Sequence, residues 1–154
     1  MNELIKKQEY IYKAKIIKNS ASLNSEGYID VIINNKKITG WVREAGDLFR
    51  IGRTYETYLL FYPDKIKFRV KKGKRETIFQ RSKPGEFTFK GTLENIFFLR
   101  PYSNHLLTVK CGINCGKRII IITKVKSNIN LKPGIYVEGK GGLHLDFLSI
   151  NPCE

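Results

Sequence analysis

Residues 134–148 have the sequence GIYVEGKGGLHLDFL, in which apolar and polar side chains alternate on both sides of the pair Gly141–Gly142. Alternation with a period of two is the pattern of a β-strand with one buried face, and paired glycines are typical of tight turns. The stretch therefore predicts two closing strands, over 134–140 and 143–148, joined by a glycine turn.

The same alternation recurs along the whole chain, in segments rich in the β-branched and aromatic residues that strands favour. Further strands are predicted over 86–93, 105–111 and 117–123 in the second half, and over 10–18, 28–33, 36–43, 54–62 and 65–70 in the first. The halves also share the phrase that precedes their fourth strands, RIGRTY at 50–55 and LKPGIY at 131–136. The chain is therefore predicted to contain two related units of five strands each.

Each unit has a long first strand, a hairpin, a connector and a closing hairpin. This order resembles the OB-fold, a five-stranded Greek-key β-barrel. The resemblance is one of pattern, covers nearly the whole chain and implies an all-β fold with two small OB-like barrels in tandem. The barrels would span 1–72 and 85–154, with a basic linker over 73–84. Small SH3-like barrels and a single ten-stranded sandwich use similar strand strings and remain alternatives.

The charge is strongly basic and unevenly distributed. The chain has 28 Lys and Arg against 14 Asp and Glu, a formal charge of +14, which favours a polyanionic partner. Residues 65–83 alone hold nine basic side chains and one acidic one. A basic strand that continues into a flexible linker could follow a chain of phosphates, although charged linkers also serve only to keep two domains soluble.

Strand alternation also predicts a basic and aromatic surface on the first unit. Outward-facing positions on its first three strands are Lys13, Lys15, Tyr28, Lys37, Trp41 and Arg43. The OB-fold resemblance implies that this surface is the one that meets oligonucleotides, because strands two and three carry ligands in that family. Bases stack on exposed aromatic rings whatever their sequence. Alternatively, Trp41 lies half-buried against the second barrel.

The second unit offers a weaker site. Residues 97–102, FFLRPY, are predicted to form its first loop, where a base could be held between Arg100 and either Phe98 or Tyr102. The same loop could instead pack as an apolar plug against the first barrel. The full set of predicted nucleic-acid-binding residues is Lys13, Lys15, Tyr28, Lys37, Trp41, Arg43, Lys65, Lys67, Arg69, Lys71, Lys72, Lys74, Arg75, Arg100 and Tyr102.

Other classes of function are disfavoured. The cysteines at 111, 115 and 153 are too few for a disulfide framework, and Cys111 and Cys115 lack the spacing of a zinc hook. The chain has no phosphate-binding glycine loop, nucleophile elbow or histidine-rich metalloenzyme motif. No apolar run is long enough to span a membrane, and residues 1–10 do not resemble a signal peptide. We therefore expect a cytoplasmic protein that is not an enzyme and needs no metal or cofactor.

The sequence predicts a module that binds single-stranded DNA or RNA with little sequence preference, by base stacking and phosphate contacts. The alternative is a protein-interaction or assembly module that docks an acidic partner, with Trp41 as an anchor. Fold alone does not distinguish these functions.

Overall fold

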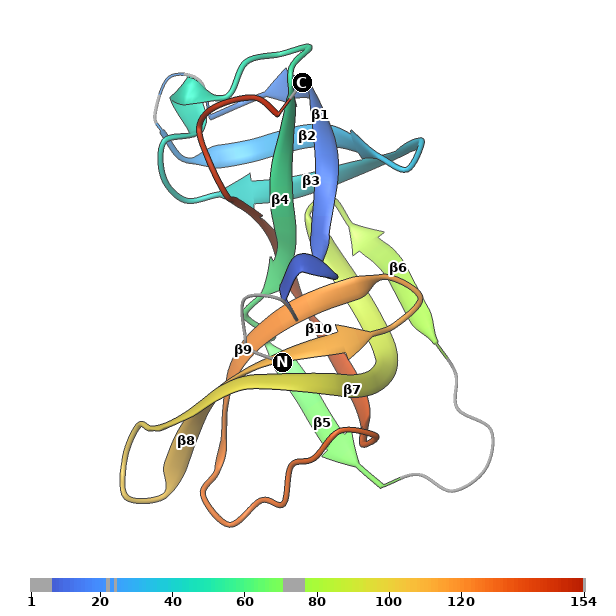
Figure 1. The fold of residues 1–154 in the computed structure, drawn as a ribbon, viewed down its shortest axis with the longest axis vertical. Helices are drawn as coiled ribbons and strands as arrows, with labels where there is room; N and C mark the ends of the chain where they lie inside the picture. The colour runs from blue at the N-terminus through green and yellow to red at the C-terminus, as the bar shows by residue number, and fades with distance from the viewer. Residues whose placement is uncertain (1–6, 22, 24, 71–76, 154) are drawn as a thin grey trace.

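The computed structural model describes residues 7–21, 23, 25–70 and 77–153. The elements are β1 (Ile11–Asn19), β2 (Gly27–Ile33), β3 (Lys36–Val42), the 3-10 helix η1 (Gly46–Leu48), β4 (Thr54–Phe61), β5 (Lys65–Arg69), β6 (Ile78–Lys83), β7 (Glu86–Pro101), β8 (Leu106–Asn114), β9 (Arg118–Lys126) and β10 (Tyr136–Phe147). Figure 1 shows β1–β3 gathered at one end of the molecule and β5–β9 at the other, with β10 running between them. The predicted all-β class is confirmed.

The first group of strands closes into a ring, which we call the first ring. Strands β1, β2 and β3 form an antiparallel meander, and β4 pairs with the other edge of β1. The ring is closed by the second half of β10, whose residues 143–147 pair antiparallel with β4. At its other edge β10 meets β3 in a parallel bridge between His144 and Trp41. The expectation of a closed barrel is thus confirmed.

A second ring is built around β7, β8 and β9, which also form an antiparallel meander. The first half of β10 pairs with β7 over residues 136–142. At the far side, β9 pairs with β4 in a short parallel ladder, Leu60 with Ile120 and Phe61 with Ile121. Because β4 also pairs with β10, the strands return to their starting point. The two rings therefore share β4 and β10.

The predicted glycine turn at Gly141–Gly142 is wrong, because β10 is continuous from Tyr136 to Phe147. Neither glycine has a positive φ, so neither forms a turn. A Cβ added to Gly141 would lie 3.0 Å from the Cα of Pro63. Glycine is needed here because another segment of backbone crosses the strand closely.

The continuous β10 makes the two halves exchange strands. Strand β5 comes from the first half of the sequence, yet it pairs with β10 over residues 65–69 and 136–140. In return, the second half of β10 closes the first ring against β4 and β3. The division into domains at residues 72 and 85 stays a prediction, and strand pairing crosses it in both directions.

Three smaller expectations are also corrected. Strand β7 continues to Pro101, so most of the predicted loop over 97–102 is strand. It is lengthened by two register shifts, between Leu93 and Asn95 and between Ile96 and Phe98, where β-bulges insert extra residues. Residues 78–83, assigned to the linker, form β6, which pairs with β7. The turn predicted over 112–116 begins later, because β8 runs to Asn114.

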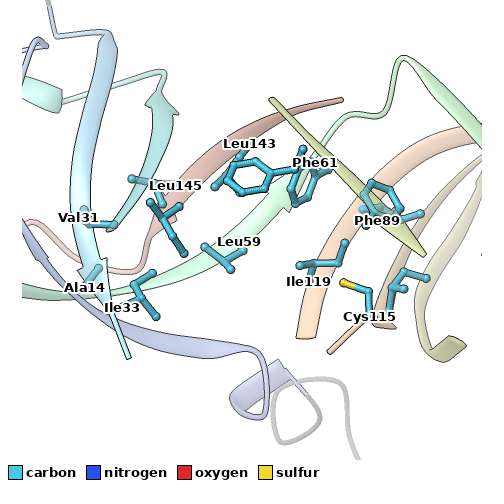
Figure 2. Packing of buried hydrophobic residues seen from close by; sticks show 14 of the residues in the cluster. Ala14, Val31, Ile33, Leu59, Phe61, Phe89, Cys115, Ile119, Leu143 and Leu145 are labelled. Carbon is cyan, nitrogen blue, oxygen red and sulfur yellow. The ribbon is translucent and has the colours of Figure 1, made fainter. Parts of the chain in front are cut away.

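One apolar core runs through both rings (Figure 2). Leu59 and Leu145 lie in the first ring, and Phe89 and Ile119 lie in the second. Phe61 stands at the junction, with its ring centroid 5.3 Å from that of Phe89. Because the core is continuous, the halves are held together by packing as well as by strand exchange.

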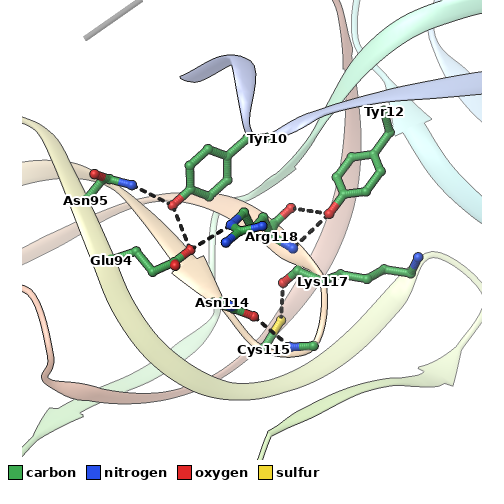
Figure 3. A network of polar contacts seen from close by, with 9 residues as sticks. Tyr10, Tyr12, Glu94, Asn95, Asn114, Cys115, Lys117 and Arg118 are labelled. Carbon is green, nitrogen blue, oxygen red and sulfur yellow. Dashed lines mark hydrogen bonds and ion pairs between the residues drawn. The ribbon is translucent and has the colours of Figure 1, made fainter. Parts of the chain in front are cut away.

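A polar network joins the start of β1 to the second ring (Figure 3). The buried Tyr10 hydroxyl donates to Glu94 Oε1 at 3.2 Å and accepts from Asn95 Nδ2 at 2.9 Å. Arg118 Nε also donates to Glu94, at 3.1 Å. Burial raises the pKa of Tyr10, so it remains a hydroxyl donor. Gly112 leaves room for this phenol, because a Cβ there would overlap the Tyr10 hydroxyl.

The strand exchange predicts that neither half folds alone. Fragments covering 1–76 and 77–154 should each lack a stable β-sheet in circular dichroism, because each is missing a strand that pairs with its own meander. Mixed together, they should recover the sheet signal and elute as one complex. Cooperative unfolding of either isolated fragment would contradict the exchange.

Tyr10→Phe tests the polar tie between the halves. The change leaves the ring but removes the hydroxyl shared by Glu94 and Asn95, and should lower the free energy of unfolding by about 1–2 kcal/mol. Urea denaturation of the whole chain measures it. Tyr62→Phe, at an exposed tyrosine, is the matched control and should change stability by less than about 0.5 kcal/mol. Equal effects of the two changes would contradict a role for the network.

Candidate nucleic-acid interface

A row of three ring-bearing side chains crosses the outer surface of the first ring. Tyr28 on β2 is the direct cross-strand partner of Trp41 on β3, and Trp41 is bridged to His144 on β10. Facing side chains on neighbouring strands stand close enough to touch. The rings of Tyr28 and Trp41 meet edge to face, with centroids 4.9 Å apart. Tyr28 is exposed and Trp41 half-buried, so both keep surface that a ligand could cover.

Two further side chains extend this row. Tyr62, just after β4, packs edge to face on His144 with ring centroids 5.2 Å apart. The guanidinium carbon of Arg43 lies 5.8 Å from the centroid of the Tyr62 ring. Both Tyr62 and Arg43 are exposed. We call these five residues the aromatic row: Tyr28, Trp41, Arg43, Tyr62 and His144.

The strand exchange builds this surface. His144 comes from the second half of the sequence and reaches Trp41 only because β10 closes the first ring. The turn between β6 and β7 also arrives from the second half: Leu143 N–H donates to Gly85 O at 2.7 Å. Gly85 lies against Tyr28, and a Cβ added there would be 2.6 Å from the tyrosine ring. The Tyr28 ring thus lies directly against the backbone of Gly85.

A hollow of about 440 Å³ opens beside the aromatic row. It is lined by Trp41, Arg43, Tyr62 and His144 together with residues 148–150 near the C-terminus. Its volume is within the range of ligand sites. The lining also includes Glu44 and Asp146, so the hollow itself is not strongly basic. Cations that would neutralise phosphates must therefore lie around the hollow as well as in it.

Titration of the hollow is set mainly by burial. Desolvation lowers the pKa of His144, and the nearby Arg43 cation lowers it further, while Asp146 opposes this. Since the ordinary histidine value is about 6.5, His144 is neutral at pH 7. Desolvation raises the pKa of Asp146, against the opposing effect of Lys110 and Lys7. Among the described residues that line the hollow, Arg43 is the basic side chain other than His144.

The predicted lysines of this surface lie apart from the aromatic row. Lys15 and Lys37 are the two cross-strand neighbours of Ile32, four residues along β2 from Tyr28. That separation is about 13 Å at the rise of a β-strand. Lys13 is farther along β1, opposite Glu56. The predicted surface is thus divided into an aromatic end and a lysine end.

Lys37 at the lysine end is partly neutralised. Its Nζ lies 3.4 Å from Asp30 Oδ2, and Thr39 donates a hydrogen bond to the other oxygen of the same carboxylate at 2.6 Å. The interaction is exposed on the lysine side and is worth little free energy. The carboxylate of Asp30 nevertheless places a negative charge between Lys37 and the aromatic row. Strand alternation alone does not reveal this ion pair.

The remaining predicted residues belong to the second ring or are not described. Lys65, Lys67 and Arg69 are exposed on β5, and Arg69 forms an ion pair with Glu138. Lys71, Lys72, Lys74 and Arg75 lie outside the described residues. None of the three described residues, Lys65, Lys67 and Arg69, lines the hollow beside Trp41.

The base site predicted between Arg100 and either Phe98 or Tyr102 has both of its aromatic rings in contact with cations. The Arg100 guanidinium lies 4.1 Å from the centroid of Phe98, and Lys124 Nζ lies 3.8 Å from the centroid of Tyr102. Each aromatic ring is thus already covered by a cation from its own β-sheet. Hydrogen bonding to Lys124 lowers the pKa of Tyr102.

Sequence reasoning missed Tyr62 and His144 as members of the site. The alternation of Leu143, His144 and Leu145 did place His144 on the outer face of its strand, and this was the available sequence signal for its role. Nothing local indicated that the strand containing it would lie beside Trp41, because the two residues are 103 positions apart in the chain.

The described residues offer little support for other kinds of site. Among them, no three His, Cys, Asp or Glu side chains gather as a metal site would require. Cys111 and Cys115 are buried as free thiols, and burial raises the pKa of each to about 12. The described part of the chain also contains no helix with the length and apolar character needed to cross a membrane.

No protein-family model and no curated protein matches this chain. The function is therefore inferred from the geometry of the aromatic row and the hollow beside it.

The lowered pKa of His144 predicts how stability changes with pH. Between its folded pKa and about 6.5, the unfolded chain binds a proton at His144 that the folded chain does not. The stability of the wild type should therefore fall, relative to that of His144→Gln, as the pH is lowered from neutral through this window. Urea denaturation of both proteins at a series of pH values measures the difference. A difference that stays constant or grows would contradict the desolvation of His144.

Proposed function

We propose that this chain binds single-stranded DNA or RNA with little sequence preference, and that each ring is an OB-like barrel completed by a strand from the other half. The observation that carries the proposal is the aromatic row: Tyr28, Trp41 and His144 stand side by side on three neighbouring strands. They are accompanied by Tyr62 and Arg43 and by a hollow of ligand size.

The position of the aromatic row supports an OB-like binding surface. In the first ring, β2 and β3 follow β1 in an antiparallel meander. The OB-fold binds oligonucleotides on the surface of its second and third strands. Tyr28 and Trp41 occupy those two strands here. The same position in the second ring, on β8 and β9, carries no aromatic side chain, which favours one binding ring and one supporting ring.

The chemistry of the aromatic row suits a base better than a peptide anchor. Every base has a π-face, so stacking on Trp41 or Tyr62 requires no particular sequence. Arg43, which lies near the Tyr62 ring, can contact a phosphate or stack on a base itself. Exposed lysines at the far end of the same sheet, Lys13 and Lys15, extend the positive potential along a bound strand. Phosphate contacts of this kind release counterions and make affinity dependent on salt.

Trp41→Ala is the direct test. Loss of one stacked base should weaken binding of a fluorescein-labelled oligo-dT by about 1–3 kcal/mol, which is about 5- to 150-fold in Kd. Fluorescence anisotropy of the labelled strand measures it in every variant. Trp41→Phe is the matched control, because it keeps an aromatic face and should retain most of the affinity. Circular dichroism checks that both variants are folded.

The same titration separates the two functional alternatives. Since Trp41 is the chain's single tryptophan, its fluorescence in the wild type should be quenched by unlabelled oligo-dT and by oligo-U. Affinity should fall steeply between about 50 and 200 mM salt. Absence of binding to both polymers at the lower salt would refute the proposed function and favour an acidic protein partner. Binding with equal affinity in the wild type and Trp41→Ala would show that the aromatic row is not the site.

A further inference from the structure

The β4–β9 ladder closes the second ring over only two residue pairs, and beyond that ladder a gap separates β9 from β5, the strand that follows β4 and pairs with β10. Among the described residues, β5 is an end strand of the sheet and pairs with β10 alone. Strand β9 pairs with β8 along its whole length, but β4 covers its other edge only at Ile120 and Ile121. From residue 122 to residue 126, that edge of β9 has no strand beside it in the described structure. Two strand edges, each with backbone groups that can pair, therefore border one gap.

A slot lies between these edges. Its larger part, lined by Lys65 and Thr88 among others, has a volume of about 670 Å³, and its smaller part, lined by Phe68 and Val125 among others, about 280 Å³. Both parts are lined by Ile66 of β5 and Lys124 of β9, so they are continuous along the strands. The slot is elongated along the strands, because its lining follows β5 from residue 65 to residue 68 and β9 from residue 123 to residue 126.

The floor of the slot is apolar. Side chains that point into the second ring form it: Ile66, Phe68, Phe89, Val125 and Ile129. All five pack in or against the core, yet Ile66, Phe68 and Ile129 are only partly buried. Covering this surface would complete the burial that the second ring lacks.

The rim of the slot is cationic. Lys65, Lys67 and Lys126 are exposed at its border, and Lys124 lies over Tyr102 at the same edge. Of the two carboxylates in the lining, Glu138 forms an ion pair with Arg69, and Asp64 lies at the turn before β5. The described lining thus holds five lysines, at positions 65, 67, 90, 124 and 126, against two carboxylates, so the slot carries a net positive charge.

We propose that the slot accepts an extended acidic peptide segment of a partner protein as an additional strand between β5 and β9. The segment would hydrogen-bond to the two strand edges through its backbone, as in β-augmentation. Side chains of a strand alternate between faces. Apolar residues of the segment would therefore cover Ile66 and Val125, while Glu or Asp residues between them meet the lysines.

Charge complementarity selects this occupant over another copy of the chain. Lysines on an edge strand normally prevent pairing with further strands. A second basic chain would meet this repulsion, whereas an acidic strand removes it. The inference is independent of the nucleic-acid site, because the slot shares no residue with the hollow beside Trp41.

The test uses the whole chain and a synthetic peptide of alternating glutamate and valine. Isothermal titration calorimetry should detect one peptide bound per chain. A second peptide carries N-methyl groups on alternate backbone nitrogens, which removes its donors along one edge but keeps every side chain. It should bind at least about tenfold more weakly, the equivalent of about 1.4 kcal/mol.

Charge variants locate the site. Lys67→Glu combined with Lys126→Glu reverses the rim on both sides of the slot and should weaken binding at least about tenfold. Lys18→Glu combined with Lys36→Glu makes the same change of charge at exposed positions of the first ring and should leave binding within about twofold. Each variant is first checked by circular dichroism and urea denaturation for an intact fold.

Four results would overturn the proposal. The first is failure of the wild-type chain to bind either peptide. The second is binding of the N-methylated peptide as tightly as its parent, which would show attraction by charge without strand pairing. Tighter binding of decanoate than of the peptide, lost in the Lys67/Lys126 double variant, would assign the slot to an anionic amphiphile. Equal weakening by the two charge variants would show that no particular site is involved.

Discussion

The structure depends on one close crossing of backbones, where β10 passes the turn between β4 and β5. Asp64 N–H donates to Lys140 O at 2.9 Å, and the Cα of Pro63 lies where a side chain on Gly141 would need space. Two residues earlier, Gly139 lies against the Phe89 ring, which a Cβ would overlap. Glycine at both positions lets β10 leave one ring and enter the other without a turn. The exchange of strands, the shared core and the position of His144 all follow from this crossing.

The sequence predicted the strands of the first half better than the way they are joined. Alternation located all five strands of that half, because each buries one face and so carries the period-two pattern. It failed at Gly141–Gly142, since a glycine pair in a turn and a glycine pair under a crossing backbone look the same in sequence. It also ended β7 too early, because bulges near Asn95 and Phe98 interrupt the alternation while the strand continues.

The candidate site shows a similar limit. Parity correctly placed Tyr28 outward and Trp41 on the same side of the sheet, since both depend only on local alternation. Alternation also grouped Lys15 and Lys37 with Tyr28 and Trp41, because it predicts which face of the sheet a residue occupies but not how far along the strand it lies. Register decides that position, and it is fixed by long-range pairing. His144 joins the site through such a pairing, the bridge between β3 and β10.

The strand exchange has opposite effects at the two ends of the molecule. Closing the first ring requires β10 to leave β5 behind, so β5 ends the sheet with β10 as its one neighbour among the described strands. Among the described residues, the hollow beside Trp41 is lined by one arginine and two carboxylates, so the nucleic-acid binding proposed there would depend on stacking, with phosphates contacted from its surroundings. At the slot, lysines border an apolar floor, and the proposed acidic segment would be attracted before any contact forms. Because the two proposed sites differ in chemistry and share no residue, they would take different ligands at once, which would let this chain bring an acidic protein to a nucleic acid.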